Sequence, residues 1–468
     1  MNIVSRALMR TWARLGPRFL PFADAATPEL PLSRLLRLSL FQVSVGMALV
    51  LLIGTLNRVM IVELGVPVSL VAIMISLPLV FAPFRALIGY KSDIHTSALG
   101  WRRVPFIWKG TMVQFGGLAI MPFALLVLSG GGNAHQWPAW IGDAGAAVAF
   151  LLVGAGLHTC QTVGLALATD LAPAESQPKV VGLMYVMLLF GMIASALIFG
   201  ALLVHFTPAR LIQVIQGCAL ATMILNVVAL WKQESRHSRK TETARKQPTF
   251  RQAWATFTED ADAIRRLVAV GLGTMAFSME DVLLEPYGGQ VLHLAVSQTT
   301  RLTATLAIGG LFGFGLASRV LGRGYDAFRM ATWGALVGLP AFAAVIFAAP
   351  TQSILLFGGG TALIGFGAGL FGHGTLTATM RSATDDQTGL ALGAWGAVQA
   401  TAAGIAVALG GIIRDLVHAV LPWIPPEQGL GYVTVYSLEF VLLVATLVSM
   451  IPLLRRVRAK AAATLVHS

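Results

Sequence analysis

Residues 232–263 read KQESRHSRKTETARKQPTFRQAWATFTEDADA and form the only long polar stretch between the apolar runs of the chain. Six apolar runs precede this stretch and six follow it, and each approaches the ~20 residues that a helix needs to cross a bilayer. The runs predict an all-α integral membrane protein with twelve transmembrane helices, in which a basic linker joins two six-helix bundles. We place these spans at 38–60, 67–90, 104–128, 143–168, 179–204, 209–231, 264–288, 298–319, 327–349, 352–379, 388–413 and 432–454.

The composition supports the same reading. The 468-residue chain is 56% hydrophobic, and only 12% of its residues are Asp, Glu, Lys or Arg, which is about half the charged fraction of a soluble globular protein. Its mean hydropathy is +0.75. The two cysteines, Cys160 and Cys218, have no metal-ligand or disulfide-framework spacing. These features exclude a soluble enzyme, a disordered protein and a disulfide-stapled secreted domain.

The charges are strongly asymmetric, with a formal net charge of +12. A basic excess can indicate nucleic-acid binding or the positive-inside rule of membrane proteins. With both termini on one side, 29 of the 33 Lys and Arg residues fall on that side. We therefore expect cytoplasmic termini and no nucleic-acid partner. We predict a cytoplasmic arm at 1–37 and a first six-helix bundle at 38–231. The basic linker covers 232–263, the second six-helix bundle 264–454 and the cytoplasmic tail 455–468.

A weak internal repeat relates the two halves. A shift of 211 residues aligns Gly154 with Gly365 and Gly156 with Gly367. Glycines at matched depth let helix backbones approach closely inside a membrane. Together with the six-plus-six layout, the repeat favours the duplicated bundles of the major facilitator fold.

The loop between the second and third predicted spans resembles the loop signature of the major facilitator superfamily. Gly89 is followed four residues later by Asp93, and Gly100 by Arg102 and Arg103. The glycine allows close helix approach, and the charged groups can pair with each other or with helix ends. Ordinary positive-inside flanking is the alternative explanation for the arginines.

The seventh predicted span carries Glu280, Asp281 and Glu285, followed by Pro286 and Tyr287. Carboxylates within a span are expensive and indicate function by default. On a continuous helix, Asp281 and Glu285 share one face. They could couple proton movement, provide oxygen ligands for a bound cofactor, or lie at a wet end of the helix. No other span shows such a cluster of deep acidic residues.

Histidines lie within two other spans. His158, with Gln161 beside it, is in the fourth, and His373 is near the middle of the tenth. An imidazole in a membrane can bind the magnesium of a chlorin, transfer a proton or hydrogen-bond a neighbouring helix. No pair of these residues has the spacing of a protein metal site.

The N-terminal arm places Arg6, Arg10 and Arg14 at four-residue spacing with Trp12 between them. This pattern is typical of an amphipathic helix on an anionic membrane surface. A docking arm for another protein is the alternative.

Four blocks together resemble the PucC/LhaA family of purple phototrophic bacteria, the bacteriochlorophyll-delivery branch of the major facilitator fold. They are LPLSRLLRLSLFQVSVG, LNRVMIVELG, APFRA and DVLLEPYGG, at 30–46, 56–65, 82–86 and 281–289. The resemblance implies a light-harvesting complex assembly factor in the intracytoplasmic (chromatophore) membrane. Its implied partners are antenna α/β polypeptides, the reaction centre and membrane lipids, with bacteriochlorophyll and carotenoid as candidate cofactors.

Within that family we favour an LhaA-type protein that serves the LH1 core antenna rather than the peripheral LH2 antenna. The resemblance makes Glu280, Asp281, Glu285, Tyr287, His158, Gln161 and His373 the candidate pigment-binding residues. The alternative is a proton-coupled transporter of a small amphipathic or porphyrin-like solute. We expect no enzyme, because the sequence contains no nucleophile–base pair, metal cluster or diphosphate-binding pattern.

Overall fold

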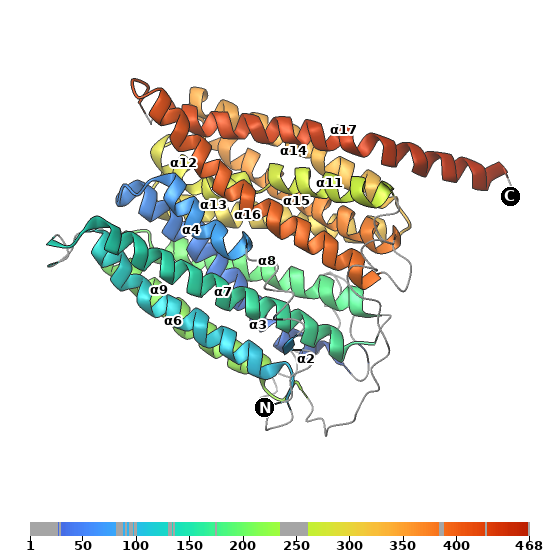
Figure 1. Ribbon diagram of the computed structural model, residues 1–468, viewed down its shortest axis with the longest axis horizontal. Coiled ribbons are helices and arrows are strands. Elements are labelled where there is room, and N and C mark those ends of the chain that lie inside the picture. Colours follow the sequence, from blue (N-terminus) through green and yellow to red (C-terminus); the bar gives the residue numbers. More distant parts are fainter. Residues whose placement is uncertain are drawn as a thin grey trace, which may run out of the picture. The chain divides into compact units, whose positions relative to one another are not determined.

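The computed structural model is helical throughout the part of the chain that it describes. Figure 1 shows long helices that run side by side within each half, among them α6 beside α7 and α14 beside α15. The described residues are 27, 30–80, 88, 91–92, 97, 101–129, 133, 136–173, 176–234, 261–382, 388–425 and 428–466.

The contacts divide the chain into two units. Unit 1 comprises residues 1–49, 84–195 and 207–240, and unit 2 comprises residues 50–83, 196–206 and 241–468. The first span is continuous from Leu32 to Glu63, so this division passes through it, between Leu49 and Val50.

The helices of unit 1 follow the apolar runs closely. Helix α9 begins after Thr207, whose hydroxyl accepts a 3.2 Å hydrogen bond from the backbone N–H of Arg210, and Pro208 occupies the first helical position, where a missing N–H costs nothing. The helices are α2 (Leu32–Leu38), α3 (Leu40–Leu49), α6 (Val104–Leu128), α7 (Ala139–Leu171), α8 (Gln177–Leu202, whose last turns belong to unit 2) and α9 (Pro208–Leu230).

Unit 2 contains the remaining helices and two π-helical segments from the first span. Asp326 caps α14 by accepting a 2.8 Å hydrogen bond from the backbone N–H of Arg329. The elements are η2 (Val50–Leu56), η3 (Val59–Glu63), α4 (Val68–Val80), α11 (Ala261–Ala276), η6 (Met279–Val282), α12 (Leu284–Gln290), α13 (Val296–Leu321), α14 (Ala327–Thr351), α15 (Ile354–Ser382), α16 (Thr388–Val420) and α17 (Leu430–Val466).

The prediction of a multi-pass membrane protein is confirmed. Among the described residues, ten helices are long and apolar enough to cross a membrane, and the bent pair Ala263–Val282 and Leu284–Gln290 would make an eleventh span. The predicted span at 67–90 corresponds to the short apolar helix α4, beyond which residues 81–87 lie outside the described part. The count of twelve therefore stays a prediction.

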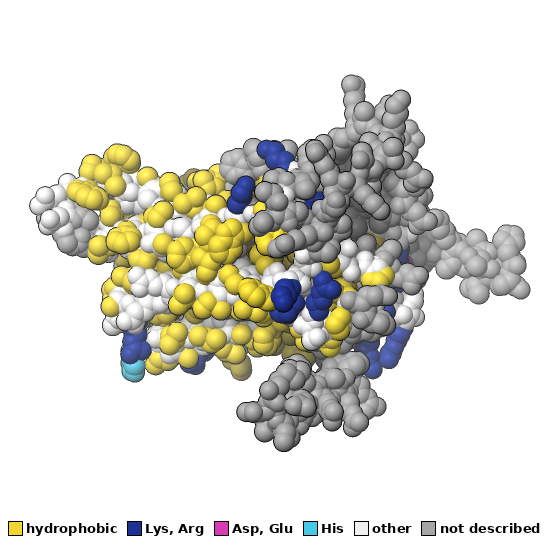
Figure 2. Space-filling model, turned by 90° about the horizontal axis from the view of Figure 1, so that it is seen from below, with side chains coloured by type: hydrophobic (Ala, Val, Ile, Leu, Met, Phe, Trp, Pro, Cys, Tyr) yellow, Lys and Arg dark blue, Asp and Glu magenta, His cyan; other side chains and the backbone are white. Residues whose placement is uncertain are grey.

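The described surface is apolar over wide areas. Large side chains are exposed on the predicted spans, including Phe123 in α6, Phe312 in α13 and Leu355 in α15. In Figure 2, apolar side chains cover much of the described surface, and acidic side chains scarcely appear. Such a surface is stable only against lipid or another apolar partner.

One of the glycine pairs aligned by the predicted repeat, Gly156 with Gly367, has equivalent packing in the two units. In unit 1, a methyl group at Gly156 of α7 would collide with the backbone of α6 at Gln114. In unit 2, a methyl group at Gly367 of α15 would lie 2.8 Å from the carbonyl oxygen of Gly334 in α14. Each glycine thus allows its helix to approach the helix that precedes it in the chain, as a duplicated bundle requires.

Candidate functional site

The seventh predicted span is interrupted in the middle of its acidic cluster. Helix α11 ends at Ala276, the short 3-10 segment η6 covers Met279–Val282, and α12 begins at Leu284. The two parts of this broken span, Ala263–Val282 and Leu284–Gln290, are bent by 41° relative to each other. Asp281 and Glu285 lie on opposite sides of the interruption, so the expectation that they share one face of a continuous helix is wrong.

Pro286 gives the physical reason for the interruption. A proline inside a helix has no N–H for the carbonyl four residues earlier, and its ring clashes with that carbonyl. The carbonyl in question belongs to Val282, the last residue of η6. Asn57 supplies the missing donor, because its Nδ2 lies 2.9 Å from the Val282 oxygen. A side chain from the first span thus stabilises the break.

Glu280 and Glu439 meet at the other side of the break. The backbone N–H of Glu280 donates a 2.7 Å hydrogen bond to Oε1 of Glu439 in α17. Both side chains are buried, with 2% and 0% of their surface exposed. The Glu439 carboxylate therefore acts as a cap for η6 from another helix, since Ser278 makes no side-chain capping bond there.

Glu285 faces a different set of partners. Its carboxylate accepts hydrogen bonds from the hydroxyls of Thr303 at 2.6 Å and Thr300 at 3.4 Å, both in α13. Gly54 of η2 lies against the same carboxylate, so closely that a methyl group at position 54 would collide with it. The absence of a side chain at Gly54 is what makes room for Glu285.

Arg58 of the first span is a buried cation that contacts the broken span at Gly289. Only 4% of the residue is exposed. Its guanidinium forms an ion pair with Glu63 and donates a 3.0 Å hydrogen bond to the carbonyl of Leu294. Gly289 packs against the guanidinium, with room for no larger side chain without displacement. Arg58 therefore joins the first span to the end of the broken span.

Tyr287 is an internal packing residue. It is fully buried, and its hydroxyl donates a 3.0 Å hydrogen bond to the carbonyl of Val345. Its ring lies edge-on to Phe357, stacked on Tyr432 and tilted against Tyr436, with centroid distances of 4.9, 5.2 and 5.6 Å. These contacts leave no face of the ring open to a pigment.

A second polar network lies at the end of α12. Gln290 Oε1 accepts from the Arg414 guanidinium at 2.6 Å and from the Tyr432 hydroxyl at 2.7 Å. Arg414 also pairs with Asp415 at 2.8 Å. Asp415 in turn accepts a 2.7 Å hydrogen bond from the backbone N–H of Ser69, in the first turn of α4.

The predicted histidines are placed differently from the carboxylates. His158 and its neighbour Gln161 are half-buried in α7 of unit 1, and His373 is half-buried in α15 of unit 2. The His373 ring packs on Phe314 with a centroid distance of 4.4 Å. Of the seven predicted pigment residues, His158 and Gln161 belong to unit 1 and the other five belong to unit 2.

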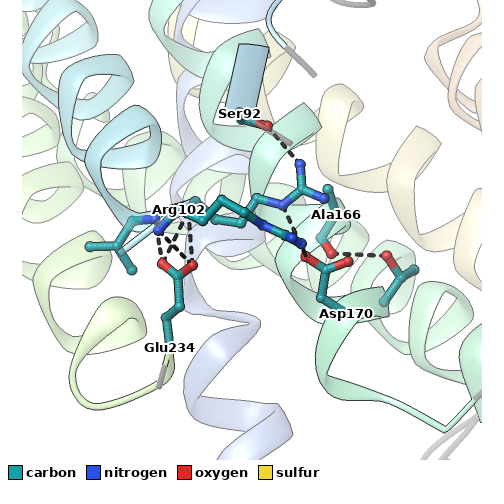
Figure 3. A network of polar contacts seen from close by, with 8 residues as sticks. Ser92, Arg102, Ala166, Asp170 and Glu234 are labelled. Carbon is teal, nitrogen blue, oxygen red and sulfur yellow. Dashed lines mark hydrogen bonds and ion pairs between the residues drawn. The ribbon is translucent and has the colours of Figure 1, made fainter. Parts of the chain in front are cut away.

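Unit 1 contains the part of the predicted loop signature that the structure describes (Figure 3). Arg103 is 5% exposed, and its guanidinium contacts Asp170 at 3.0 Å and Ser92 at 2.7 Å. Arg102 reaches the same Asp170 oxygen at 2.8 Å. The carboxylate that pairs with both arginines is Asp170 of α7, and a pairing with Asp93 of the predicted signature stays a prediction.

Glu234 completes this network. It is the last residue of unit 1 that the structure describes before the gap at 235–260. Its carboxylate accepts from the backbone N–H groups of Arg102, Arg103 and Val104 at 2.8, 3.0 and 3.0 Å. These are the unsatisfied donors at the start of α6. An acidic side chain at a helix N-terminus is also electrostatically favourable.

Several predicted residues lie outside the described part of the chain. They are Gly89, Asp93 and Gly100 of the loop signature, and Arg6, Arg10, Trp12 and Arg14 of the N-terminal arm. Most of the basic linker, residues 235–260, also lies outside it.

Sequence reasoning missed Glu439, Asn57, Gln290 and Asp415. The prediction that the deep acidic residues cluster on one helix is wrong, because Glu439 of α17 joins Glu280. A signal was present: Glu439 is a single carboxylate within the apolar run 432–454, and an ionisable residue inside a span indicates function. Its partner, 159 residues away in the chain, could not be found from spacing.

Known proteins match the chain over most of its length. The PUCC protein family matches residues 55–458. The chain belongs to the PUCC family. Protein PucC of Rhodovulum sulfidophilum is 66% identical over 89% of this chain and 93% of its own length. Protein PucC of Cereibacter sphaeroides is 60% identical over 94% of this chain and 96% of its own length. The "Bacteriochlorophyll synthase 44.5 kDa chain" of Rhodobacter capsulatus is 27% identical over 83% of this chain and 89% of its own length.

Solved transporters share the fold of this PUCC-family protein. A point mutant of the nucleoside transporter NupG superposes with a TM-score of 0.66 at 13% identity, over 90% of this chain and 99% of its own. A bacterial homologue of the human lysosomal transporter Spinster, inward-facing and unoccupied, gives 0.62 at 14% identity, over 90% and 94%. The fold is therefore of the major facilitator type, as the six-plus-six layout predicted.

Proposed function

We propose that this PUCC-family protein is a non-enzymatic assembly factor for the bacterial light-harvesting antenna, which assists the insertion or oligomerisation of antenna α/β polypeptides. The observation that carries the proposal is the family match over residues 55–458, supported by relatives that share up to 66% identity and bear the name PucC. The predicted client is LH1 around the reaction centre. The peripheral antenna LH2 is tested as the competing client.

The proposed location is the intracytoplasmic membrane, with twelve spans and both termini in the cytoplasm. The 29 of 33 Lys and Arg residues that fall on one side of this arrangement support it. The α/β polypeptides would meet the protein through its apolar surface, where side chains such as Phe312 and Leu355 are exposed. Apolar helices pack against each other there without desolvating any charge.

The candidate pigment ligands can be narrowed by burial. A bacteriochlorophyll macrocycle is flat and large, and its magnesium takes an imidazole or oxygen ligand that must reach its face. Glu280 and Glu285 are 2% and 1% exposed, and Tyr287 is fully enclosed, so they do not fit this task. His158 and His373 are half-buried within spans, which fits an imidazole that presents one nitrogen to a pigment beside the helix. Gln161 and Asp281 are also half-buried. Carotenoid stays a candidate cofactor for the apolar surface.

Purification of the tagged protein from phototrophic membranes in a mild detergent tests the proposal. We expect antenna α/β polypeptides and bacteriochlorophyll in the eluate. A tagged unrelated major facilitator transporter from the same membranes is the matched control. Recovery of neither polypeptides nor pigment above that control would contradict the assembly role. Repeating the purification from strains that lack LH1 or LH2 identifies the client.

A proton-coupled transporter of a small amphipathic or porphyrin-like solute is the second candidate. The observation that favours it is the pair of buried carboxylates, Glu280 and Glu439, at a break in a span of a transporter-type fold. It predicts solute uptake into liposomes that is driven by a pH gradient and abolished by Glu280→Gln. Absence of uptake for several porphyrin-like solutes would contradict the transporter function and leave the assembly role as the remaining candidate.

A further inference from the structure

Three buried polar atoms at the break have no hydrogen-bond partner among the described residues. They are Oε2 of Glu280, Oε2 of Glu439 and the hydroxyl of Tyr436. Their residues are 2%, 0% and 0% exposed. Buried polar groups in native proteins are almost always hydrogen-bonded, so three such atoms in one place indicate a ligand.

The three groups lie close together. Glu439 Oε1 is held 2.7 Å from the backbone nitrogen of Glu280. Tyr436 is three residues before Glu439 in α17 and therefore on the same helical face. The ring of Tyr436 packs between Tyr287 and Phe342, at 5.6 and 6.2 Å between centroids, which fixes its direction.

Among the residues that the structure describes, no cationic side chain pairs with the carboxylates of this cluster. Neither Glu280 nor Glu439 has an ion pair among the described residues, and the nearby Arg58 is engaged with Glu63 and the Leu294 carbonyl. Asp281, next in the chain, adds a third carboxyl group. Two buried carboxylates without a counter-ion are unstable, because burial of unpaired charge is very costly.

The other elements packed against η6 bring no cation to it either, within the part of the chain that the structure describes. Besides α17, these are α16, α4 and η2. Helix α16 approaches through Gly410, which lies against Met279. Its charged residues near this contact, Arg414 and Asp415, pair with each other and are also bonded to Gln290 and to the Ser69 N–H. The first span contributes the neutral side chain of Asn57. The titratable groups on the broken span and α17 that lie near the break are Asp281, Glu285, Tyr287 and Tyr432, which are acids or phenols.

We propose that Glu280, Glu439 and Tyr436 form a buried site for one monovalent cation, a proton or a sodium ion, at the break in the seventh span. Three oxygen atoms without partners are suitable ligands for either, and interrupted helices are where membrane proteins bind such ions. The cation neutralises one carboxylate, and the backbone N–H of Glu280 stabilises the other. The cation site can be tested independently of the proposed antenna role, because the test uses purified protein without antenna polypeptides.

The test is the thermal midpoint of the purified full-length protein in detergent, measured from pH 6 to pH 9 in choline chloride and in NaCl. If the occupant is a proton, the wild-type midpoint falls as pH rises in both salts, because loss of the proton leaves two buried negative charges. If sodium can occupy the site, NaCl raises the midpoint at pH 9 relative to choline chloride. Glu280→Gln and Glu439→Gln remove either dependence, since one charge is gone in each.

Two further variants keep the test decisive. Tyr436→Phe removes only the unpartnered hydroxyl and weakens the dependence on pH or sodium, even where a glutamine variant fails to fold. Asp326→Asn, which keeps the N-cap of α14, behaves as the wild type. Identical pH and sodium responses in the wild type, Tyr436→Phe and the glutamine variants that fold would overturn the proposal.

Discussion

Asn57 Nδ2 lies 2.9 Å from the carbonyl oxygen of Val282, the acceptor that Pro286 leaves without an intrahelical donor. This hydrogen bond connects the first span to the broken span within unit 2. It explains how a helix interruption can persist among apolar side chains, where an unpaired carbonyl would be costly. The break in turn separates the environments of Glu280 and Glu285.

Asn57→Ala should destabilise the protein by about 1–3 kcal/mol, because it leaves the buried Val282 carbonyl unsatisfied. Thermal or denaturant unfolding in detergent measures the effect. Pro286→Ala restores an N–H at position 286, so the double variant should lose less stability than the two single variants together. Strict additivity of the two changes, within about 0.5 kcal/mol, would show that Asn57 does not serve this carbonyl.

Gly54→Ala should destabilise unit 2 by about 1–3 kcal/mol, since a methyl group there collides with the Glu285 carboxylate. Glu285→Asp withdraws the carboxylate and should relieve part of the loss. Gly358→Ala in α15 is the matched control, because a methyl group there meets no atom within 4 Å. The control should be neutral or slightly stabilising. Equal effects of the two glycine substitutions would refute the close approach.

Glu234→Ala should expose the start of α6. Its carboxylate accepts from the N–H groups of Arg102, Arg103 and Val104, and loss of a helix cap costs about 0.5–2 kcal/mol. Hydrogen exchange of these three amides should become faster, while exchange in the middle of α6 is unchanged. Glu234→Gln should retain part of the protection. Unchanged exchange at all three amides in the alanine variant would contradict the capping role.

The proposed function predicts that bacteriochlorophyll copurifies with the protein, and that replacement of both half-buried histidines, His158→Phe with His373→Phe, removes it. Glu285→Gln should leave it bound, because Glu285 is enclosed by Thr300 and Thr303. Absorbance of the purified protein, normalised to its concentration, measures the pigment. Loss of pigment in Glu285→Gln and retention in the histidine variant would reverse our assignment of the ligands.

The positions of most spans could be predicted from the sequence, but the contacts between spans could not. The run 104–128 coincides with α6, and the run 327–349 ends two residues before α14 does. A long apolar run with polar ends forms a helix in a bilayer, because a helix satisfies its backbone hydrogen bonds within the segment. The break was also visible in principle, since Pro286 disfavours a helix at Val282. The Glu280–Glu439 contact was not, because apolar runs do not reveal which helices pack together or which face each presents.

The most direct test of the proposed antenna-assembly function is deletion of the gene in its phototrophic host, followed by absorbance spectroscopy of the isolated membranes. The proposal predicts that antenna absorption falls sharply relative to reaction-centre absorption, and that the wild-type gene restores it. An unchanged ratio of antenna to reaction centre in the deletion strain would contradict the assembly function.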